Sequence, residues 1–385
     1  MIIRPSSLAK KLRCEYLWHT REVMGVVTPD RHDARFRGTL FHALMEQALR
    51  VYAEQDFVFA YNGEQGEEMT RWVCGELYRD RGVMADEVLA REVLESVRYH
   101  IPRLDLPSWE VLRTRDGRPC IELELTAPYG DDGQHTIAHR IDLAMRKRES
   151  GRAYHVDFKS SADNVQRPNS TDRDYQLLFA RYLLREHGVD VDGSLLLHLR
   201  SKAPTPPEVV YKGKKNERLS TSKDQACDWQ TYAAAVRARG EDPSAEHLVD
   251  LRNALDANVF AKWQPDVSTP TAERLMWAQL DRVLDRMHAL ASGDTPTRNL
   301  GYACRPSPKS SGCDYNTWCS AGMHDPSGHD VSQVGMHYQL TDSSPLVQIR
   351  RANADKLADP GAPFVAFAAR NGSPNHEPLS PFVPK

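Results

Sequence analysis

The sequence has little of what marks a membrane or secreted protein. No stretch approaches the ~18 consecutive apolar residues that a membrane-spanning helix needs. The opening residues, MIIRPSSLAKKLRC, carry charges where a signal peptide has an apolar segment. Net charge is small as well, since 50 Lys and Arg against 53 Asp and Glu give −3 at pH 7. We expect a cytoplasmic protein with no membrane partner, in which nucleic-acid binding would depend on local basic patches.

The chain also lacks the composition of a disordered or fibrous protein, and it has no internal repeat. Its 385 residues are 40% hydrophobic and 27% charged, with 22 Gly and 24 Pro, which is ordinary for globular proteins. In a reducing compartment, the seven cysteines are not expected to form a disulfide framework. Clustered cysteines therefore indicate metal ligands or buried thiols.

Hydrophobic periodicity predicts helices first and strands afterwards. Apolar residues recur at helical spacing over 33–55 and 66–101. Alternation and turn signals then predict a run of short strands, a helix and a further strand, over 109–117, 120–130, 135–149, 152–161, 174–187 and 193–200 respectively. This order is typical of an α/β fold with a mixed sheet flanked by helices.

Changes in composition divide the chain into four segments. We expect a core over 1–202, a helical insertion over 203–297, a cysteine-rich segment over 298–330 that joins the core, and a flexible Pro-rich tail over 331–385. The insertion begins with a Pro-rich and then Lys-rich stretch. Its predicted helices lie near 228–239, 244–260 and 271–291.

Two aspartates and a lysine form the most informative pattern. Asp142 ends HRID on one predicted strand, and Asp157 and Lys159 lie in VDFKS on the next. Asp157 and Lys159 share a face because strand residues alternate, and a hairpin would bring Asp142 beside them. Two carboxylates and a lysine suit phosphodiester hydrolysis assisted by Mg²⁺ or Mn²⁺. By itself, however, D-x-K on a strand is commonly a solvated, salt-bridging face.

Polar residues on neighbouring elements add to this pattern. Gln176 lies on the helix after the strand pair, and His42 and Glu46 lie four residues apart on the first long helix. Taken alone, a helical Gln is usually solvated and a helical His is usually a core residue. Glu122 and Glu124 are possible accessory acids, although the solubility of an edge strand explains them more simply.

The motifs GTLFHALME, HRID, VDFKS and the DYQ helix, in this order, resemble the RecB-like branch of the PD-(D/E)xK nuclease superfamily. The resemblance covers about 1–202 and 298–322 and implies a restriction-endonuclease-like core. It implies that His42, Asp142 and Asp157 bind the metal. It also implies that Lys159 is catalytic and that Gln176 supports the site.

Two positions depart from the family pattern. Ile141 stands where the superfamily name has Pro, which this branch tolerates. Ala180 stands where the family usually has Tyr four residues after the Gln, and Tyr182 lies nearby. This departure affects the expected role of Tyr182 and leaves the metal site intact.

A second constellation consists of four cysteines, Cys14, Cys304, Cys313 and Cys319, with C-x8-C-x5-C spacing in the late trio. Four thiolates suit zinc or an iron–sulfur cluster. One early and three late cysteines resemble the iron–sulfur exonucleases of the CRISPR-adaptation type and the AddB nuclease domain, which implies a [4Fe–4S] cluster. Their late trio is commonly C-x2-C-x5-C, so Cys304 departs from that pattern.

Other interpretations of the cysteines stay open. Cys313, Cys319, His324 and His329 are an alternative zinc ligand set. The cysteines of both sets are alternatively unmetallated thiols. The isolated residues Cys74, Cys120 and Cys227 are expected to be buried or incidental.

Basic residues gather over 1–24 and 200–223, where they suit phosphate contacts that are independent of base sequence. Trp18, Tyr211 and Trp229 are candidates for stacking on unpaired bases. A solvated, mobile loop explains the Lys-rich KGKK stretch equally well.

Together these patterns favour a metal-dependent exonuclease that acts on DNA ends or single strands. An alternative is a catalytically weak or inactive DNA-end adaptor within a recombination or packaging assembly, although such an adaptor has no need of all three catalytic residues. A third interpretation is a zinc protein whose acidic strand face is structural. By family analogy, we expect a phage or bacterial setting in recombination or repair, with a helicase as one possible partner.

Overall fold

The computed structural model describes most of the chain up to residue 296. The described residues are 1–27, 33–81, 87–161, 174–212, 216–257, 260–266, 269–294, 296 and 339–340. The chain divides into two compact units, one of residues 1–12 and 30–294 and the other of residues 13–29 and 295–385. Among the described residues, no helix is both long enough and apolar enough to span a membrane.

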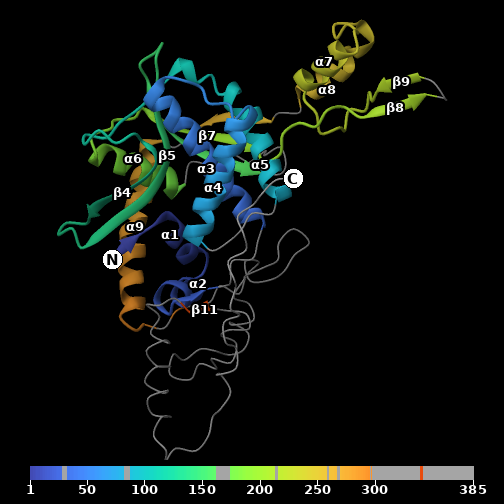
Figure 1. Cartoon of the computed structure of the whole chain (residues 1–385). Helices are drawn as coiled ribbons and strands as arrows, with labels where there is room; N and C mark the ends of the chain where they lie inside the picture. The colour runs from blue at the N-terminus through green and yellow to red at the C-terminus, as the bar shows by residue number, and fades with distance from the viewer. Residues whose placement is uncertain are drawn as a thin grey trace, which may run out of the picture. The chain divides into compact units, whose positions relative to one another are not determined.

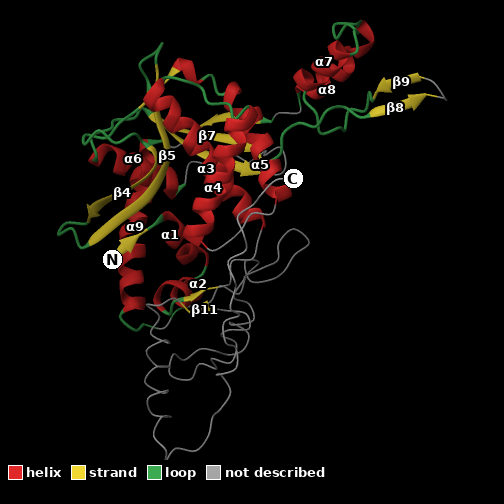
Figure 2. Cartoon of the chain, in the orientation of Figure 1, coloured by secondary structure: helices red, strands yellow, loops and turns green. Residues whose placement is uncertain are grey.

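A mixed sheet forms the centre of the first unit (Figure 1, Figure 2). Its strands are β1 (Ile2–Ile3), β3 (Trp109–Val111), β4 (Ile121–Tyr129), β5 (His135–Lys147), β6 (Ala153–Ser161), β7 (Gly193–Arg200) and β10 (Ala261–Pro265). The order is β1-β5-β6-β7-β10, and β3 and β4 also pair with β5. β5 runs antiparallel to β4 and β6, whereas β6 and β7 are parallel. The expected mixed sheet is confirmed.

Helices flank this sheet. The helices of the first unit are α1 (Pro5–Arg13), α3 (Asp33–Gln55), α4 (Gly63–Arg81), α5 (Glu87–His100), α6 (Tyr175–Glu186), α7 (Trp229–Ala238), α8 (Val249–Asp256) and α9 (Pro270–Ala291). Of these, α7 and α8 lie apart from the central sheet (Figure 1). The apolar stripe of α3 packs with α5 and the sheet, so that residues such as Leu40, Leu44 and Val97 are fully buried. Tyr52 lies on α3, and its hydroxyl donates to the carbonyls of Leu106 and Trp109. This contact links α3 to the start of β3.

Helices cover both faces of the sheet. Neighbouring strand residues point to opposite faces, and β6 shows this clearly. Phe158 belongs to the core cluster that contains α3 and α5, whereas Lys159 reaches Gln176 on α6. α3 and α6 therefore lie on opposite sides of the sheet, as Figure 1 shows around β5.

The segment over 203–297, which the sequence predicts to be a helical insertion, contains strands as well as helices. It begins with a hairpin of β8 (Val209–Lys212) and β9 (Asn216–Leu219), and Leu219 packs in one apolar cluster with α7 and α8. β10 then pairs with β7 over five residues and so belongs to the central sheet. The prediction was wrong there because β10 is short and covers an edge of β7 that would otherwise stay unpaired.

The last helix of this segment, α9, also packs on the core. Trp277 stacks on Phe179 of α6, with ring centroids 6.0 Å apart. Arg181 of α6 forms ion pairs with Asp266 and Glu273. Thr269 caps the start of α9, since its Oγ1 accepts from Ala272 N at 3.1 Å.

In the second unit, the described elements are α2 (Glu15–Trp18), the π-helical turn His19–Val23, β2 (Val26–Val27) and β11 (Gln339–Leu340). β11 pairs antiparallel with β2, so two residues of the expected flexible tail form a strand. The expectation that Trp18 stacks on bases is wrong, because its side chain is buried in the helical turn, with 3% exposed. The rest of 331–385 and all of 298–330 lie outside the described residues.

Candidate metal centre

The hairpin of β5 and β6 opens where its two aspartates lie. The ladder ends with the pair of Leu143 and Val156, so the next pair in register is Asp142 and Asp157. Backbone pairing stops there, and Phe158 N–H donates instead to Asp142 Oδ2 at 2.8 Å. A carboxylate thereby takes the place of a backbone acceptor, which fixes Asp142 beside the strand that carries Asp157.

Strand β4 adds a third carboxylate at the same level. The β4–β5 ladder has pairs on both sides of Glu122 but none between Glu122 and Asp142 themselves. Glu122 has a φ of 43°, a left-handed conformation that costs a non-glycine residue about 1–3 kcal/mol. Glu122, Asp142 and Asp157 thus occupy one register level on three neighbouring strands. Like charges in such a row repel one another, so the row favours a bound cation.

Helix α3 places His42 at this row. His42 Nδ1 lies 2.8 Å from Glu122 Oε1 and 3.8 Å from Asp142 Oδ2. One ligand atom from each of these three residues lies within 4.8 Å of the other two. The His42 ring makes edge-to-face contacts with Phe41 and Phe158, whose ring centroids lie 6.4 and 6.0 Å away. These contacts orient the imidazole toward the carboxylates.

Lys159 lies on the α6 side of the same row. Its Nζ is 2.6 Å from Asp157 Oδ2 and donates to Gln176 Oε1 at 2.7 Å. Gln176 is in turn held at the start of α6, where the cap residue Asp174 accepts from Gln176 N at 2.8 Å. The helix start therefore fixes the amide that holds the lysine.

Burial and neighbouring charges both shift the pKa values of these groups. Burial raises the pKa of Asp142 to about 7, against the opposing effect of His42, and the charges of Asp157 and Glu122 add to the rise. Burial also raises the pKa of Asp157, although Lys159 opposes this shift. For His42, burial acts to lower the pKa, but the hydrogen bond to Glu122 and the charge of Asp142 outweigh it and raise the pKa to about 8.

A divalent cation fits this group of residues. Mg²⁺ and Mn²⁺ prefer oxygen ligands. Mn²⁺ also accepts an imidazole as an additional ligand. Asp142 and Glu122 offer carboxylate oxygens next to the His42 nitrogen, and Asp157 follows on the adjoining strand. A cation here would offset both the burial and the carboxylate repulsion that raise the pKa of Asp142.

A sequence profile of the PD-(D/E)XK nuclease superfamily matches residues 3–320. The chain belongs to this superfamily. A search of curated proteins finds no match. As a PD-(D/E)XK nuclease, the protein is a metal-dependent nuclease, and the Asp157-x-Lys159 sequence corresponds to the letters DxK of the family name. The divalent metal that such nucleases use fits the His42, Glu122 and Asp142 group.

The structure brings together the residues expected at the nuclease site, with two additions. His42, Asp142, Asp157, Lys159 and Gln176 are linked to one another by the contacts above, and their catalytic roles stay predictions. The first addition is Glu122. The sequence alone explained this residue more simply by the solubility of an edge strand than by a role at the site. The second is Asp174, the first residue of the DYQ motif, which caps α6 and is a recognisable capping signal.

Other expected residues lie elsewhere. Tyr182 donates from its hydroxyl to the Pro128 carbonyl at 2.6 Å and contacts Trp277, so it packs at the end of β4. Cys14 is half-buried before α2. Cys304, Cys313 and Cys319 lie outside the described residues, as do His324 and His329.

The aromatic residues of the insertion differ in exposure. Tyr211 on β8 is 71% exposed. Trp229 stacks on Tyr232 and packs against the apolar cluster of α7 and α8, so it is less suited to base stacking than we had expected. Of the isolated cysteines, Cys120 and Cys227 are buried and Cys74 is half-buried.

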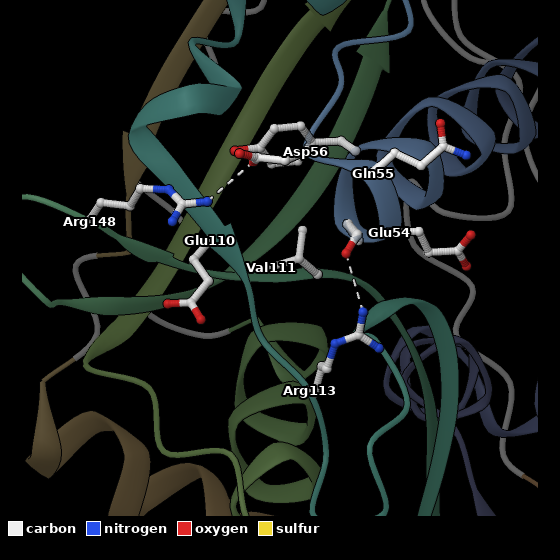
Figure 3. A pocket seen from close by; sticks show the side chains of 9 residues that line it. Glu54, Gln55, Asp56, Glu110, Val111, Arg113 and Arg148 are labelled. Atoms are coloured by element: carbon white, nitrogen blue, oxygen red, sulfur yellow. Dashed lines mark hydrogen bonds and ion pairs between the residues drawn. The ribbon is translucent and has the colours of Figure 1, made fainter.

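An open pocket of about 440 Å³ lies at the other end of α3 (Figure 3). Its wall combines Asp56 and Glu110 with Arg113 and Arg148, and Arg148 pairs with Asp56 at 3.4 Å. Tyr52 in this wall is ten residues from His42, which is about 15 Å along a helix. The pocket is therefore separate from the carboxylate row.

Proposed function

We propose that the protein is a DNA exonuclease that acts on DNA ends or single strands. The observation that carries this proposal is the row of Glu122, Asp142 and Asp157 with Lys159 held beside it by Gln176. The superfamily match supports hydrolysis of nucleic acid. The resemblance to the RecB-like branch supports DNA as the substrate and exonucleolytic action.

Each residue has a separate task in the proposed mechanism. His42, Glu122, Asp142 and Asp157 would hold a divalent cation, which supplies a water of lowered pKa and neutralises charge on the phosphate. Asp142 keeps its position through the Phe158 N–H. Lys159 would donate to the attacking water or to the phosphoryl oxygen on which charge grows. Gln176 and Asp174 keep the lysine at the edge of the row.

The test compares Lys159→Ala with Lys147→Ala, which changes the last residue of β5. We expect Lys159→Ala to retain DNA binding and to lose about 1000-fold or more in metal-dependent cleavage. Lys147→Ala should cleave like the wild type, because Lys147 lies over the Trp109 ring and far from the row. Full cleavage by Lys159→Ala would refute the assignment.

The mode of cleavage has its own test. Linear single-stranded and duplex DNA are compared with circular DNA of the same sequence in the presence of Mg²⁺. An exonuclease releases short products from the linear forms and leaves the circular forms intact. Cleavage of covalently closed circles at a similar rate would show endonucleolytic action instead.

We also propose that Cys14, Cys304, Cys313 and Cys319 hold a [4Fe–4S] cluster. Two observations support this. The superfamily match spans all four positions, and β11 pairs with β2, which follows Cys14 in the same unit. A cluster would staple the start of the chain to the segment after residue 295, a long loop closure in which cross-linking is most effective in principle.

Anaerobic purification tests the cluster. We expect brown protein with iron and sulfide in equal amounts, and loss of the colour in Cys14→Ser. Cys74→Ser is the matched control, because this half-buried cysteine lies on α4, outside the proposed set. Zinc without iron, retained in Cys14→Ser, would support the alternative set of Cys313, Cys319, His324 and His329.

A further inference from the structure

We infer that Arg140 binds a backbone phosphate of the DNA strand that is cut, an inference that rests on the proposed function. Arg140 lies on β5, two residues before Asp142. Its Nε is 2.9 Å from Glu122 Oε2, while the other oxygen of that carboxylate faces His42. The guanidinium of Arg140 is thus in direct contact with Glu122, one of the candidate metal ligands.

Arg140 is the cation of this cluster that offers most surface to a substrate. Its side chain is 54% exposed, compared with 35% for Arg50 and 20% for Lys159. Arg50 uses both Nε and Nη2 on Glu46. Lys159 is occupied by Asp157 and Gln176.

The contacts of Arg140 leave part of its guanidinium available. Nε faces Glu122, and Nη2 lies 3.6 Å from Glu46 Oε2, which is beyond hydrogen-bond distance. Within the described part of the chain, Nη1 has no recorded partner. Glu122 therefore holds the group from one side, and the remaining N–H groups of its planar fork can still donate to two oxygens of a phosphate.

The acidic side chains of the site favour such a contact. A phosphate that enters meets Glu46, Glu122, Asp142 and Asp157, all of which repel it. The proposed divalent cation offsets part of this repulsion, and a guanidinium beside Glu122 extends the positive field to the phosphate next to the reacting one. The rival role for Arg140 is simple neutralisation of Glu122, and the two roles differ in their effect on DNA affinity.

The same strand provides a matched control. Arg146 lies six residues further along β5, on the same face and about 20 Å away. It is 45% exposed and pairs with the exposed carboxylate of Glu110 at 3.4 Å. Arg146 thus resembles Arg140 in exposure and ion pairing but lies at the end of the strand without the carboxylate row.

The experiment measures binding of labelled single-stranded DNA over a series of salt concentrations. Arg140→Gln, Arg140→Lys and Arg146→Gln are each placed in the Lys159→Ala protein, with Mg²⁺ present. We expect Arg140→Gln to weaken binding about tenfold and to reduce the slope of log K against log salt by about one. Arg140→Lys should keep the slope, and Arg146→Gln should change neither quantity. With Lys159 intact, Arg140→Gln should raise KM far more than it lowers kcat.

Three results would overturn the inference. Arg140→Gln and Arg146→Gln with the same affinity and slope would remove Arg140 from the DNA contact. Loss of Mn²⁺ affinity in Arg140→Gln with unchanged DNA affinity would assign Arg140 to the support of Glu122 alone. Absence of any DNA binding by the Lys159→Ala parent would overturn the proposed function along with this inference, whereas the first two results would leave that function standing.

Discussion

The ring of Phe41 contacts two histidines whose surroundings drive their protonation in opposite directions. Its centroid lies 6.4 Å from the His42 ring and 6.2 Å from the His100 ring. Burial acts to lower the pKa of both. For His100, burial prevails against the Arg200 carbonyl and lowers the pKa to about 4. For His42, the hydrogen bond to Glu122 and nearby carboxylate charge prevail and raise the pKa to about 8.

The difference separates a core histidine from a histidine at a cation site. His100 Nε2 lies 2.9 Å from the backbone carbonyl of Arg200. The aromatic rings of Phe41 and Tyr99 that contact it carry no charge. His42 instead lies beside two carboxylates, since its Nδ1 is 2.8 Å from Glu122 Oε1 and 3.8 Å from Asp142 Oδ2. Burial alone therefore does not define the site. The three carboxylates at one register level of the sheet, with His42 beside them, define it.

Among the changes considered, removal of one carboxylate from the row beside His42 should have the largest effect. We expect Asp142→Asn to reduce metal-dependent cleavage by about 1000-fold or more, because a neutral amide is a poor ligand for Mg²⁺. The pKa of His42, followed by NMR titration, should fall because the charge of Asp142 helps to raise it.

The matched control for this variant is Asp192→Asn. Asp192 accepts from Ala153 N at 2.7 Å, so it also receives a backbone N–H of β6, but at the far end of the strand. Cleavage by Asp192→Asn should match the wild type. Equal cleavage by Asp142→Asn and Asp192→Asn would contradict the assigned role of Asp142.

Acid titration should reveal the core histidine. The fold keeps His100 neutral down to about pH 4, while the unfolded chain takes up the proton near its ordinary pKa of 6.5. Neutral His100 makes its full contribution to the free energy of unfolding above pH 6.5. This contribution, about 3 kcal/mol, is lost as the pH falls toward 4. Urea unfolding should show a weaker pH dependence between 6.5 and 4 in His100→Gln. An unchanged dependence would contradict the burial effect.

Alkaline titration should show that the stability contribution of His42 falls as the pH rises, which is opposite to the behaviour of His100. Its pKa is raised to about 8, so the stability it contributes is present below pH 6.5 and is lost as the pH rises through 8. The expected loss is about 2 kcal/mol without divalent cations. His42→Gln should remove this dependence, while His100→Gln should keep it. The same alkaline loss in both variants would show that His42 is not the titrating group.

Much of the site follows from local sequence rules. Asp157 and Lys159 share a face because strand residues alternate, and the turn at Ser150-Gly151 places Asp142 on the partner strand. Gln176 falls in the first turn of the next helix, close to the strand end that carries Lys159. Short-range patterns suffice for these residues because each of them lies on a regular element.

Glu122 does not follow from those rules. Strand alternation places Glu122 and Glu124 on one face, but the left-handed backbone at Glu122 separates them. The Glu122 side chain is 6% exposed and turns toward His42, whereas Glu124 is 60% exposed and pairs with Arg4. A single unusual φ angle depends on the tertiary surroundings, which a periodicity does not encode.

The strand β10 escaped prediction for a similar reason. Its five residues, AKWQP, carry no clear alternation, and their pairing partner β7 lies about 60 residues earlier in the chain. Pairing across such a distance depends on the edge that the folded sheet leaves available.

Calorimetric titration of Mn²⁺ tests the central claim most directly, since it measures the cation site without requiring catalysis. The wild type and Arg146→Gln should bind Mn²⁺ with the same affinity, whereas Asp142→Asn and Glu122→Gln should each weaken binding by about tenfold or more. If all four proteins bind Mn²⁺ equally, the carboxylate row is not the metal centre, and the mechanism built on it is wrong.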